Sequence, residues 1–171
     1  AYEFADRDWS SDVCSSDLVV NIQGDEPFIE PAQLKELAVG FKTNAPILTL
    51  IKHIMDVDTL FSVNTPKVVI NQKGEALYFS RQTIPHLRGI AEQDWLSNHR
   101  FFKHIGLYAY RADVLIELSH LKPSPLELAE SLEQLRWLEN GYTIQTIETQ
   151  FETMGIDTPD DLEKIKKMGL L

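Results

Sequence analysis

The sequence predicts an α/β domain organised around one mixed sheet, and two patterns carry that prediction. Apolar runs at residues 19–22 and 46–51 flank a stretch with helical spacing, which is the pattern of two parallel strands joined by a crossover helix. Residues 67–70 and 76–79 are also strand-like, and the polar turn between them predicts an antiparallel hairpin. We therefore expect parallel and antiparallel strands in one sheet, with the parallel pairs in the majority.

The first predicted strand ends in a polar turn. Val19, Val20 and Ile22 are typical of a buried strand. Gly24 ends this run, and a glycine lets the backbone turn sharply or come close to a ligand. Asp25 then projects from the carboxyl end of the strand, which is where ligands bind in open α/β sheets. A solvated turn aspartate would fit this local pattern as well.

Four helices are expected in the next part of the chain. Pro31 suits a first helical position, and the apolar residues after it recur at helical spacing, so this helix packs on the sheet. Residues 56–61 and 112–121 predict two more helices. Ser124 begins what we expect to be the longest helix, which ends in an αL cap at residues 140–141.

The predicted longest helix has two distinct sides. Leu128, Leu132 and Leu135 form an apolar sector, whereas Glu133 and Gln134 lie in a polar one together with Glu130. A strand at residues 142–148 and a helix from Thr158 complete the chain.

Residues 83–98 lack periodicity and predict a long mobile loop, which would suit a lid over a substrate or a subunit contact. Residues 101–110 alternate loosely and predict a strand. Ile105, Leu107 and Ala109 fall on one face of that strand, and the other face carries His104 and Tyr108.

Composition narrows the classes of partner. The 171 residues carry a formal net charge of −10, which argues against a nucleic acid or an anionic membrane as partner. A nucleoside triphosphate remains compatible, because a metal ion and a few local cations can meet its charge. The single cysteine, Cys14, excludes a disulfide framework within this chain. No apolar run approaches the length of a membrane span.

The first residues differ in character from the rest. Residues 8–18 match, residue for residue, the translation of a common sequencing-library adapter. We therefore expect residues 1–18 to be a non-native or unassigned leader, and residues 19–171 to form the C-terminal portion of a single domain.

Short motifs follow one another from the first strand to the end of the chain. The run Gln23-Gly24-Asp25-Glu26-Pro27 is followed by motifs at residues 78–81, 104–111, 123–127, 132–136 and 155–159. In residue type and order they resemble the cytidylyltransferases that activate 3-deoxy-manno-octulosonate (Kdo). The resemblance covers about residue 19 to the C-terminus. It implies a three-layer, Rossmann-like mixed sheet of the nucleotide-diphospho-sugar transferase type.

The resemblance also implies a reaction and its residues. CTP and Kdo would give CMP-Kdo and pyrophosphate for lipopolysaccharide assembly in the cytoplasm, with Mg²⁺ as cofactor. Asp25 and Asp157 match the family's catalytic metal ligands, and carboxylates suit Mg²⁺. Asp157 has a second explanation, because an acidic residue is favourable beside the helix start at Thr158. The residues that match the substrate pocket are Gln23, Arg81, His104, Tyr108, Glu133 and Gln134.

Taken singly, these pocket residues also have ordinary structural explanations. Arg81 could end a strand at the surface, His104 could be a hydrogen-bonded core histidine, and Glu133 could lie on a solvated helix face. The number of matches in the family's order is what favours a common pocket.

Family members begin with a strand and a basic, glycine-containing loop that holds the triphosphate, and the sequence contains no such run. We therefore expect a fold without that nucleotide-loop portion and no transferase activity from this chain alone. Two alternatives stay open: a cytidylyltransferase for another acidic sugar, such as a sialic acid or an 8-amino Kdo analogue, or an inactive sugar-binding or dimerisation fragment. The resemblance also implies a homodimer, with the hairpin, residues 83–98 and the long helix as candidate contact surfaces.

Overall fold

The computed structural model describes residues 18–22, 29–41 and 45–151. The helices and strands in this part of the chain are, in order, β1 (Leu18–Ile22), α1 (Pro31–Gly40), β2 (Ile47–His53), α2 (Val57–Phe61), β3 (Lys67–Ile70), β4 (Ala76–Ser80), η2 (Glu92–Asp94), α3 (Trp95–Asn98), β5 (Phe102–Arg111), α4 (Ala112–Ser119), α5 (Pro125–Glu130), α6 (Gln134–Glu139) and β6 (Ile144–Glu148). Gln23, Asp25 and Asp157 lie outside the described residues, as does the helix expected from Thr158.

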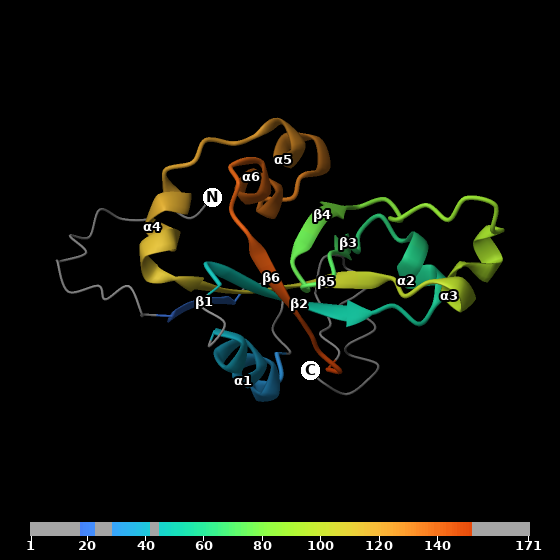
Figure 1. The fold of residues 1–171 in the computed structure, drawn as a ribbon, viewed down its shortest axis with the longest axis horizontal. Coiled ribbons are helices and arrows are strands. Elements are labelled where there is room, and N and C mark those ends of the chain that lie inside the picture. The colour runs from blue at the N-terminus through green and yellow to red at the C-terminus, as the bar shows by residue number, and fades with distance from the viewer. Residues whose placement is uncertain (1–17, 23–28, 42–44, 152–171) are drawn as a thin grey trace, which may run out of the picture.

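Three layers make up the described part of the molecule. Helix α1 lies on one face of the sheet, and α4 and α6 lie on the other, with α5 beside α6 (Figure 1). On the α1 face, Leu37 packs against Leu48 and Leu107. On the opposite face, Leu118 of α4 and Trp137 of α6 belong to one larger core cluster. This arrangement confirms the predicted three-layer mixed α/β fold.

The pairing of the strands corrects the expectation of a mostly parallel sheet. The strand order is β4-β3-β5-β2-β6, and β1 also pairs with β5. Among the described strands, only β2 and β6 pair in parallel. Strands β1 and β2 run the same way, but β5 lies between them and is antiparallel to both. Residues on both faces of β5 are buried, so this late strand can occupy the centre of the sheet and separate the earlier two.

The first strand is less buried than its sequence predicts. It begins at Leu18, opposite Arg111, one residue before the expected start. The exposed fractions of Val20 and Ile22 are 36% and 50%. Within the described residues β1 pairs only with β5 and has no partner strand at its other edge, so its β-branched residues do not imply burial here.

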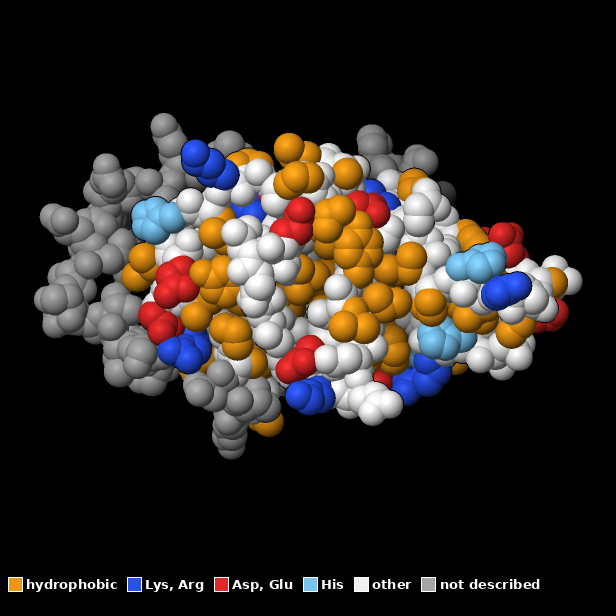
Figure 2. All heavy atoms as spheres, turned by 45° about the horizontal axis from the view of Figure 1, so that its top comes forward, with side chains coloured by type: hydrophobic (Ala, Val, Ile, Leu, Met, Phe, Trp, Pro, Cys, Tyr) orange, Lys and Arg blue, Asp and Glu red, His pale blue; other side chains and the backbone are white. Residues whose placement is uncertain are grey.

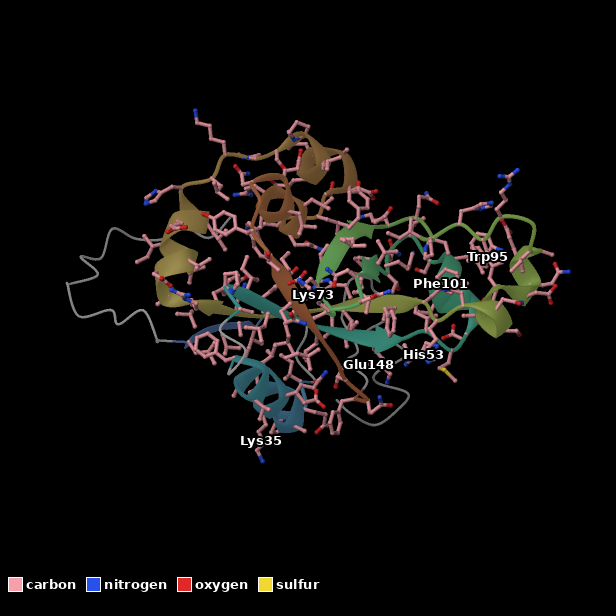
Figure 3. The ribbon with its side chains drawn as sticks, in the orientation of Figure 1. Lys35, His53, Lys73, Trp95, Phe101 and Glu148 are labelled. Atoms are coloured by element: carbon pink, nitrogen blue, oxygen red, sulfur yellow. The ribbon has the colours of Figure 1, made fainter. Side chains whose placement is uncertain are left out.

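The segment at residues 83–98 also differs from the long loop that was expected. It contains the two short helical elements η2 and α3, and Trp95 is only 3% exposed. The indole Nε1 of Trp95 donates a hydrogen bond to the carbonyl of Ile90 at 3.0 Å. Its ring stacks on Phe101, with 5.9 Å between ring centroids, and both lie at the same end of the molecule in Figure 3. Because one aromatic residue holds this segment in place, the absence of periodicity in its sequence wrongly predicted a long mobile loop.

The predicted longest helix is two helices. Ser131 adopts the left-handed conformation at φ 52°, which ends α5 and turns the chain before α6 begins. Arg136 of α6 forms a two-point ion pair with Glu127 of α5, in which Nε donates to Oε2 at 2.7 Å. That pairing fixes the angle between the two helices. Leu128 is 70% exposed as a result, so the predicted apolar sector is wrong at this residue.

The remaining elements predicted within the described residues are confirmed with small shifts of their ends. Pro31 is the first residue of α1, and Asp56 caps α2 by accepting a hydrogen bond from the Thr59 amide. The hairpin turn contains Gly74 at φ 77°, a conformation that favours glycine. The left-handed Gly141 follows α6, as expected of the cap.

Candidate active site

Two residues predicted for the substrate pocket lie together on the centre of the sheet. His104 and Tyr108 are on the same face of β5, with 5.2 Å between their ring centroids. Phe79 of β4 meets His104 edge-on at 5.1 Å, and Trp137 of α6 meets Tyr108 edge-on at 5.1 Å. The alternation along β5 therefore placed these side chains correctly, on the face that α6 covers.

His104 is half-buried and neutral. Burial lowers the pKa of His104 to about 3, because a charged imidazole would lose its hydration there. Its Nε2 lies 2.9 Å from the hydroxyl of Thr49, a buried residue of β2. At neutral pH this histidine therefore carries no charge and can act only as a hydrogen-bonding group.

The neighbouring tyrosines are also held in their neutral forms. Burial raises the pKa of Tyr108 well above its ordinary value, and Tyr110 and Glu133 add to the shift. Burial likewise raises the pKa of Tyr110, whose hydroxyl is hydrogen-bonded to the Asn21 side chain. The electrostatic effect of Glu133 on both tyrosines places the start of α6 close to this face of β5.

Glu133 and Gln134 stand at the start of α6 with different surroundings. The side chain of Glu133 is 61% exposed and lies 3.6 Å from the guanidinium of Arg136. Gln134 is only 4% exposed, and its Nε2 is buried without a hydrogen-bond partner among the described residues. A buried amide nitrogen without an acceptor costs free energy, so a ligand oxygen would be a favourable partner for it.

Arg81 is held at the junction between the hairpin and the α5–α6 turn. Its Nε donates to the Glu130 carbonyl at 2.8 Å, and its Nη1 and Nη2 donate to the Val63 and Ser131 carbonyls at 3.3 Å each. The Glu130 carboxylate accepts from the Arg81 amide at 3.0 Å. The guanidinium therefore donates to neutral carbonyls and forms no ion pair with a carboxylate in the described part of the chain.

Lys67 lies buried against this junction and stabilises it. The sequence analysis did not predict this role. Its side chain is fully buried. Nζ donates three hydrogen bonds, to the carbonyls of Ser62, Thr65 and Arg81, at 2.7, 2.7 and 2.6 Å. Desolvation by burial, followed by the nearby charge of Arg81, lowers the pKa of Lys67 to about 8. The one feature of the sequence that could have indicated this role is a lysine at the start of an otherwise apolar strand.

The profile of the cytidylyltransferase family matches residues 8–148 of the sequence. The chain belongs to the cytidylyltransferase family. The match begins inside the segment expected to be a leader, so the leader remains a prediction.

The 3-deoxy-manno-octulosonate cytidylyltransferase of Cytophaga hutchinsonii is 61% identical to this cytidylyltransferase over 150 residues, which is 87% of this chain and 60% of the relative. The chain thus spans about 60% of the length of that curated relative.

Two solved structures share the fold of this cytidylyltransferase. A CMP:2-keto-3-deoxy-manno-octonic acid synthetase complexed with CTP superposes with a TM-score of 0.78 at 41% identity, over 90% of this chain and 62% of that one. A putative glucose-1-phosphate thymidylyltransferase from Bacillus anthracis, in complex with sucrose, superposes with a TM-score of 0.50 at 18% identity, over 90% of this chain and 55% of that one. The second likeness bears on the fold alone. Together the two confirm the nucleotidyltransferase type of mixed sheet.

This cytidylyltransferase also has a hollow away from the predicted residues. It has a volume of about 780 Å³ and is lined by β3, the start of β5 and the segment around Pro85 and Leu96. Of the sequence-predicted site residues that the structure describes, none lines it.

The structure thus brings together part of the predicted site. His104 and Tyr108 belong to the face of the sheet beneath α6, and Glu133 and Gln134 stand at the start of α6, with Glu133 close enough to act on Tyr108. Arg81 lies beyond Phe79, at the end of β4.

Figure 2 shows hydrophobic side chains over the middle of one face of the molecule, with Lys and Arg side chains dispersed along the margins. None of the described helices is long and apolar enough to cross a bilayer.

Proposed function

We propose that this chain belongs to an enzyme that activates Kdo with CTP, giving CMP-Kdo and pyrophosphate. The observation that carries the proposal is its 61% identity, over 87% of the chain, to the Kdo cytidylyltransferase of Cytophaga hutchinsonii. The likeness to a synthetase complexed with CTP supports the nucleotide assignment. In the reaction a sugar hydroxyl attacks the α-phosphate of CTP, pyrophosphate leaves, and the hydroxyl proton passes to solvent.

Kdo is a polyhydroxylated acid, and the predicted pocket residues offer matching groups. The Arg81 guanidinium, which meets neutral carbonyls, would attract the sugar carboxylate. The unpartnered Nε2 of Gln134 is a donor for a sugar oxygen, and neutral His104 and exposed Glu133 can accept from sugar hydroxyls. Gln23 and Tyr108 complete the proposed sugar contacts.

The proposed cofactor is Mg²⁺, with Asp25 and Asp157 as its ligands. Among the described residues no three His, Cys, Asp or Glu side chains are grouped to hold a metal ion. Mg²⁺ needs only one or two protein carboxylates in addition to phosphate oxygens and water, so a pair of aspartates fits its chemistry. When bound, the ion would neutralise negative charge on the phosphoryl oxygens.

The chain by itself should bind sugar without turning it over. The sequence has no basic, glycine-containing run of the kind that holds the triphosphate in the family. We therefore propose that turnover requires the part of the Cytophaga hutchinsonii relative that this chain does not match. Joining that part to this chain should produce pyrophosphate release that depends on CTP, Kdo and Mg²⁺.

We also propose a cytoplasmic homodimer. The cytoplasm supplies CTP, and the net charge of −10 offers no attraction to anionic membranes. Strand β4 is at one end of the described strand order, and Leu77 on it is 60% exposed. A second copy would cover such an edge, and two-fold pairing is the commonest way to do so. Light scattering at micromolar concentration should give twice the chain mass, and a monomer would reject the proposal.

The sugar assignment is tested by titrating the isotope-labelled chain with Kdo, an 8-amino Kdo analogue and N-acetylneuraminic acid. Kdo should bind most tightly. Gln134→Met should weaken Kdo binding roughly tenfold, since a hydrogen bond is worth about 1.4 kcal/mol at that ratio. Gln72→Met, in the exposed hairpin turn, is the control and should bind as the unaltered chain does. Tighter binding of the sialic acid than of Kdo would show that the enzyme activates another acidic sugar. If no sugar bound, the chain would be an inactive fragment and the proposed sugar site would be rejected.

A further inference from the structure

The pairing of β2 with β5 is interrupted beside His104. Thr49 lies opposite Tyr108, but the next residue of β2, Leu50, lies opposite Ile105. Gly106 and Leu107 are therefore skipped by β2 and form a bulge in β5. Bulges often redirect a side chain next to a functional site.

The hydroxyl of Thr49 lies against this bulge. Its Oγ1 is 2.9 Å from the carbonyl oxygen of Leu107, 3.3 Å from that of Ile105 and 2.9 Å from Nε2 of His104. Thr49 is fully buried, and it faces the same core as Ile47 and Ile51, its neighbours on that side of β2. A valine would fill the same space, so packing alone does not explain a hydroxyl at this place.

The number of hydrogen atoms available around Thr49 favours one arrangement of hydrogen bonds. The hydroxyl has a single hydrogen, whereas the two carbonyl oxygens can only accept. If that hydrogen pointed to His104, the oxygen of Thr49 would face carbonyl oxygens with no proton between them. The favourable arrangement has the hydroxyl donating to Leu107 and accepting from the Nε2–H of His104.

We propose that Thr49 is a positioning residue that holds His104 in the Nε2–H tautomer and so leaves Nδ1 as a hydrogen-bond acceptor for a sugar hydroxyl. The sugar contact rests on the proposed function. No described residue forms a hydrogen bond with Nδ1. The rings of Phe79 and Tyr108, at 5.1 and 5.2 Å from the imidazole, restrict its rotation and so keep Nδ1 in one direction.

Nuclear magnetic resonance on the ¹⁵N-labelled chain, without sugar or nucleotide, tests the tautomer. Two-bond ¹H–¹⁵N correlations distinguish the protonated ring nitrogen from the bare one, and His104→Asn identifies the resonances of His104 among those of the 5 histidines. The spectra of Thr49→Val, Thr49→Ala and Thr49→Ser are compared with that of the unaltered chain. Thr146→Val is the matched control, because Thr146 lies beside Thr49 on β6 but donates its hydroxyl to Gly74.

The unaltered chain, Thr49→Ser and Thr146→Val should show His104 as the Nε2–H tautomer at neutral pH. Thr49→Val and Thr49→Ala should lose this single-tautomer signature and show both forms. An Nδ1–H tautomer in the unaltered chain would overturn the proposal, even if both hydroxyl-free variants fail to fold. An unchanged tautomer in either hydroxyl-free variant would also overturn it. Failure of Kdo to bind the unaltered chain would instead count against the proposed function, because the tautomer is measured without sugar.

Discussion

Replacing Lys67 by methionine should destabilise the fold strongly, because one buried ammonium donates to three backbone carbonyls on two separate segments of the chain. The carbonyls of Ser62, Thr65 and Arg81 all accept from its Nζ, at distances of 2.6 to 2.7 Å. Methionine preserves the length and the apolar stem of the side chain but donates no hydrogen bond. If each abandoned carbonyl costs about 1 kcal/mol, the loss sums to about 3 kcal/mol.

Part of that loss is offset, because methionine no longer requires an ammonium to be desolvated. We therefore expect the free energy of unfolding to fall by about 2–3 kcal/mol. For a chain of this size, a change of that magnitude lowers the melting temperature by roughly 4–12 °C. Urea denaturation followed by circular dichroism measures the free energy, and a thermal scan measures the shift.

Lys73→Met is the control. Lys73 lies in the exposed hairpin turn (Figure 3), so its replacement should change the free energy of unfolding by less than about 0.5 kcal/mol. If Lys67→Met were as stable as Lys73→Met, the three hydrogen bonds would contribute nothing net, and the reasoning about the Arg81 junction would be wrong.

Three further predictions concern separate features. Ser131→Gly should raise the free energy of unfolding by about 0.5 kcal/mol in urea denaturation, because glycine adopts φ 52° without a Cβ clash; a loss of stability would contradict this. His104 stays neutral down to a pKa of about 3, whereas an unfolded histidine protonates near 6.5. The free energy of unfolding should therefore fall by about 1.6 kcal/mol between pH 6.5 and 5. In His104→Gln this contribution to the pH dependence should be absent, and an unchanged slope would show that His104 is protonated when folded. With the unmatched part of the Cytophaga hutchinsonii relative joined to the chain, Asp25→Asn and Asp157→Asn should each reduce Mg²⁺-dependent turnover about a hundredfold or more with little change in melting temperature. A destabilised but fully active Asp157→Asn variant would instead show that Asp157 stabilises the helix start and is not a metal ligand.

Local rules explain what the sequence predicts well. The alternation of residues 101–110 placed Ile105 and Leu107 on one face and His104 and Tyr108 on the other, and the core clusters follow that division. Pro31, Asp56 and Gly74 mark the helix starts and the hairpin turn, because their backbone and capping preferences act within a few residues.

Contacts between distant residues explain what the sequence analysis missed. The break between α5 and α6 depends on Ser131 turning so that Glu130 can accept hydrogen bonds from Ser80 and Arg81, about fifty positions earlier in the chain. Residues 83–98 were expected to form a loop because their one anchor, Trp95, has no periodic companions. Neither contact leaves a repeating pattern in the sequence.

The sequence by itself determined the type of most strands and helices, the face of β5 that carries His104, and the family resemblance, because these depend on residue type and short spacings. Tertiary structure alone decided that β5 lies between β1 and β2 and that a bulge sets Thr49 against His104. It also decided that Lys67 is buried beneath Arg81. Strand order and register depend on burying both faces of one sheet at once, so they depend on all the strands together and not on any single stretch of sequence.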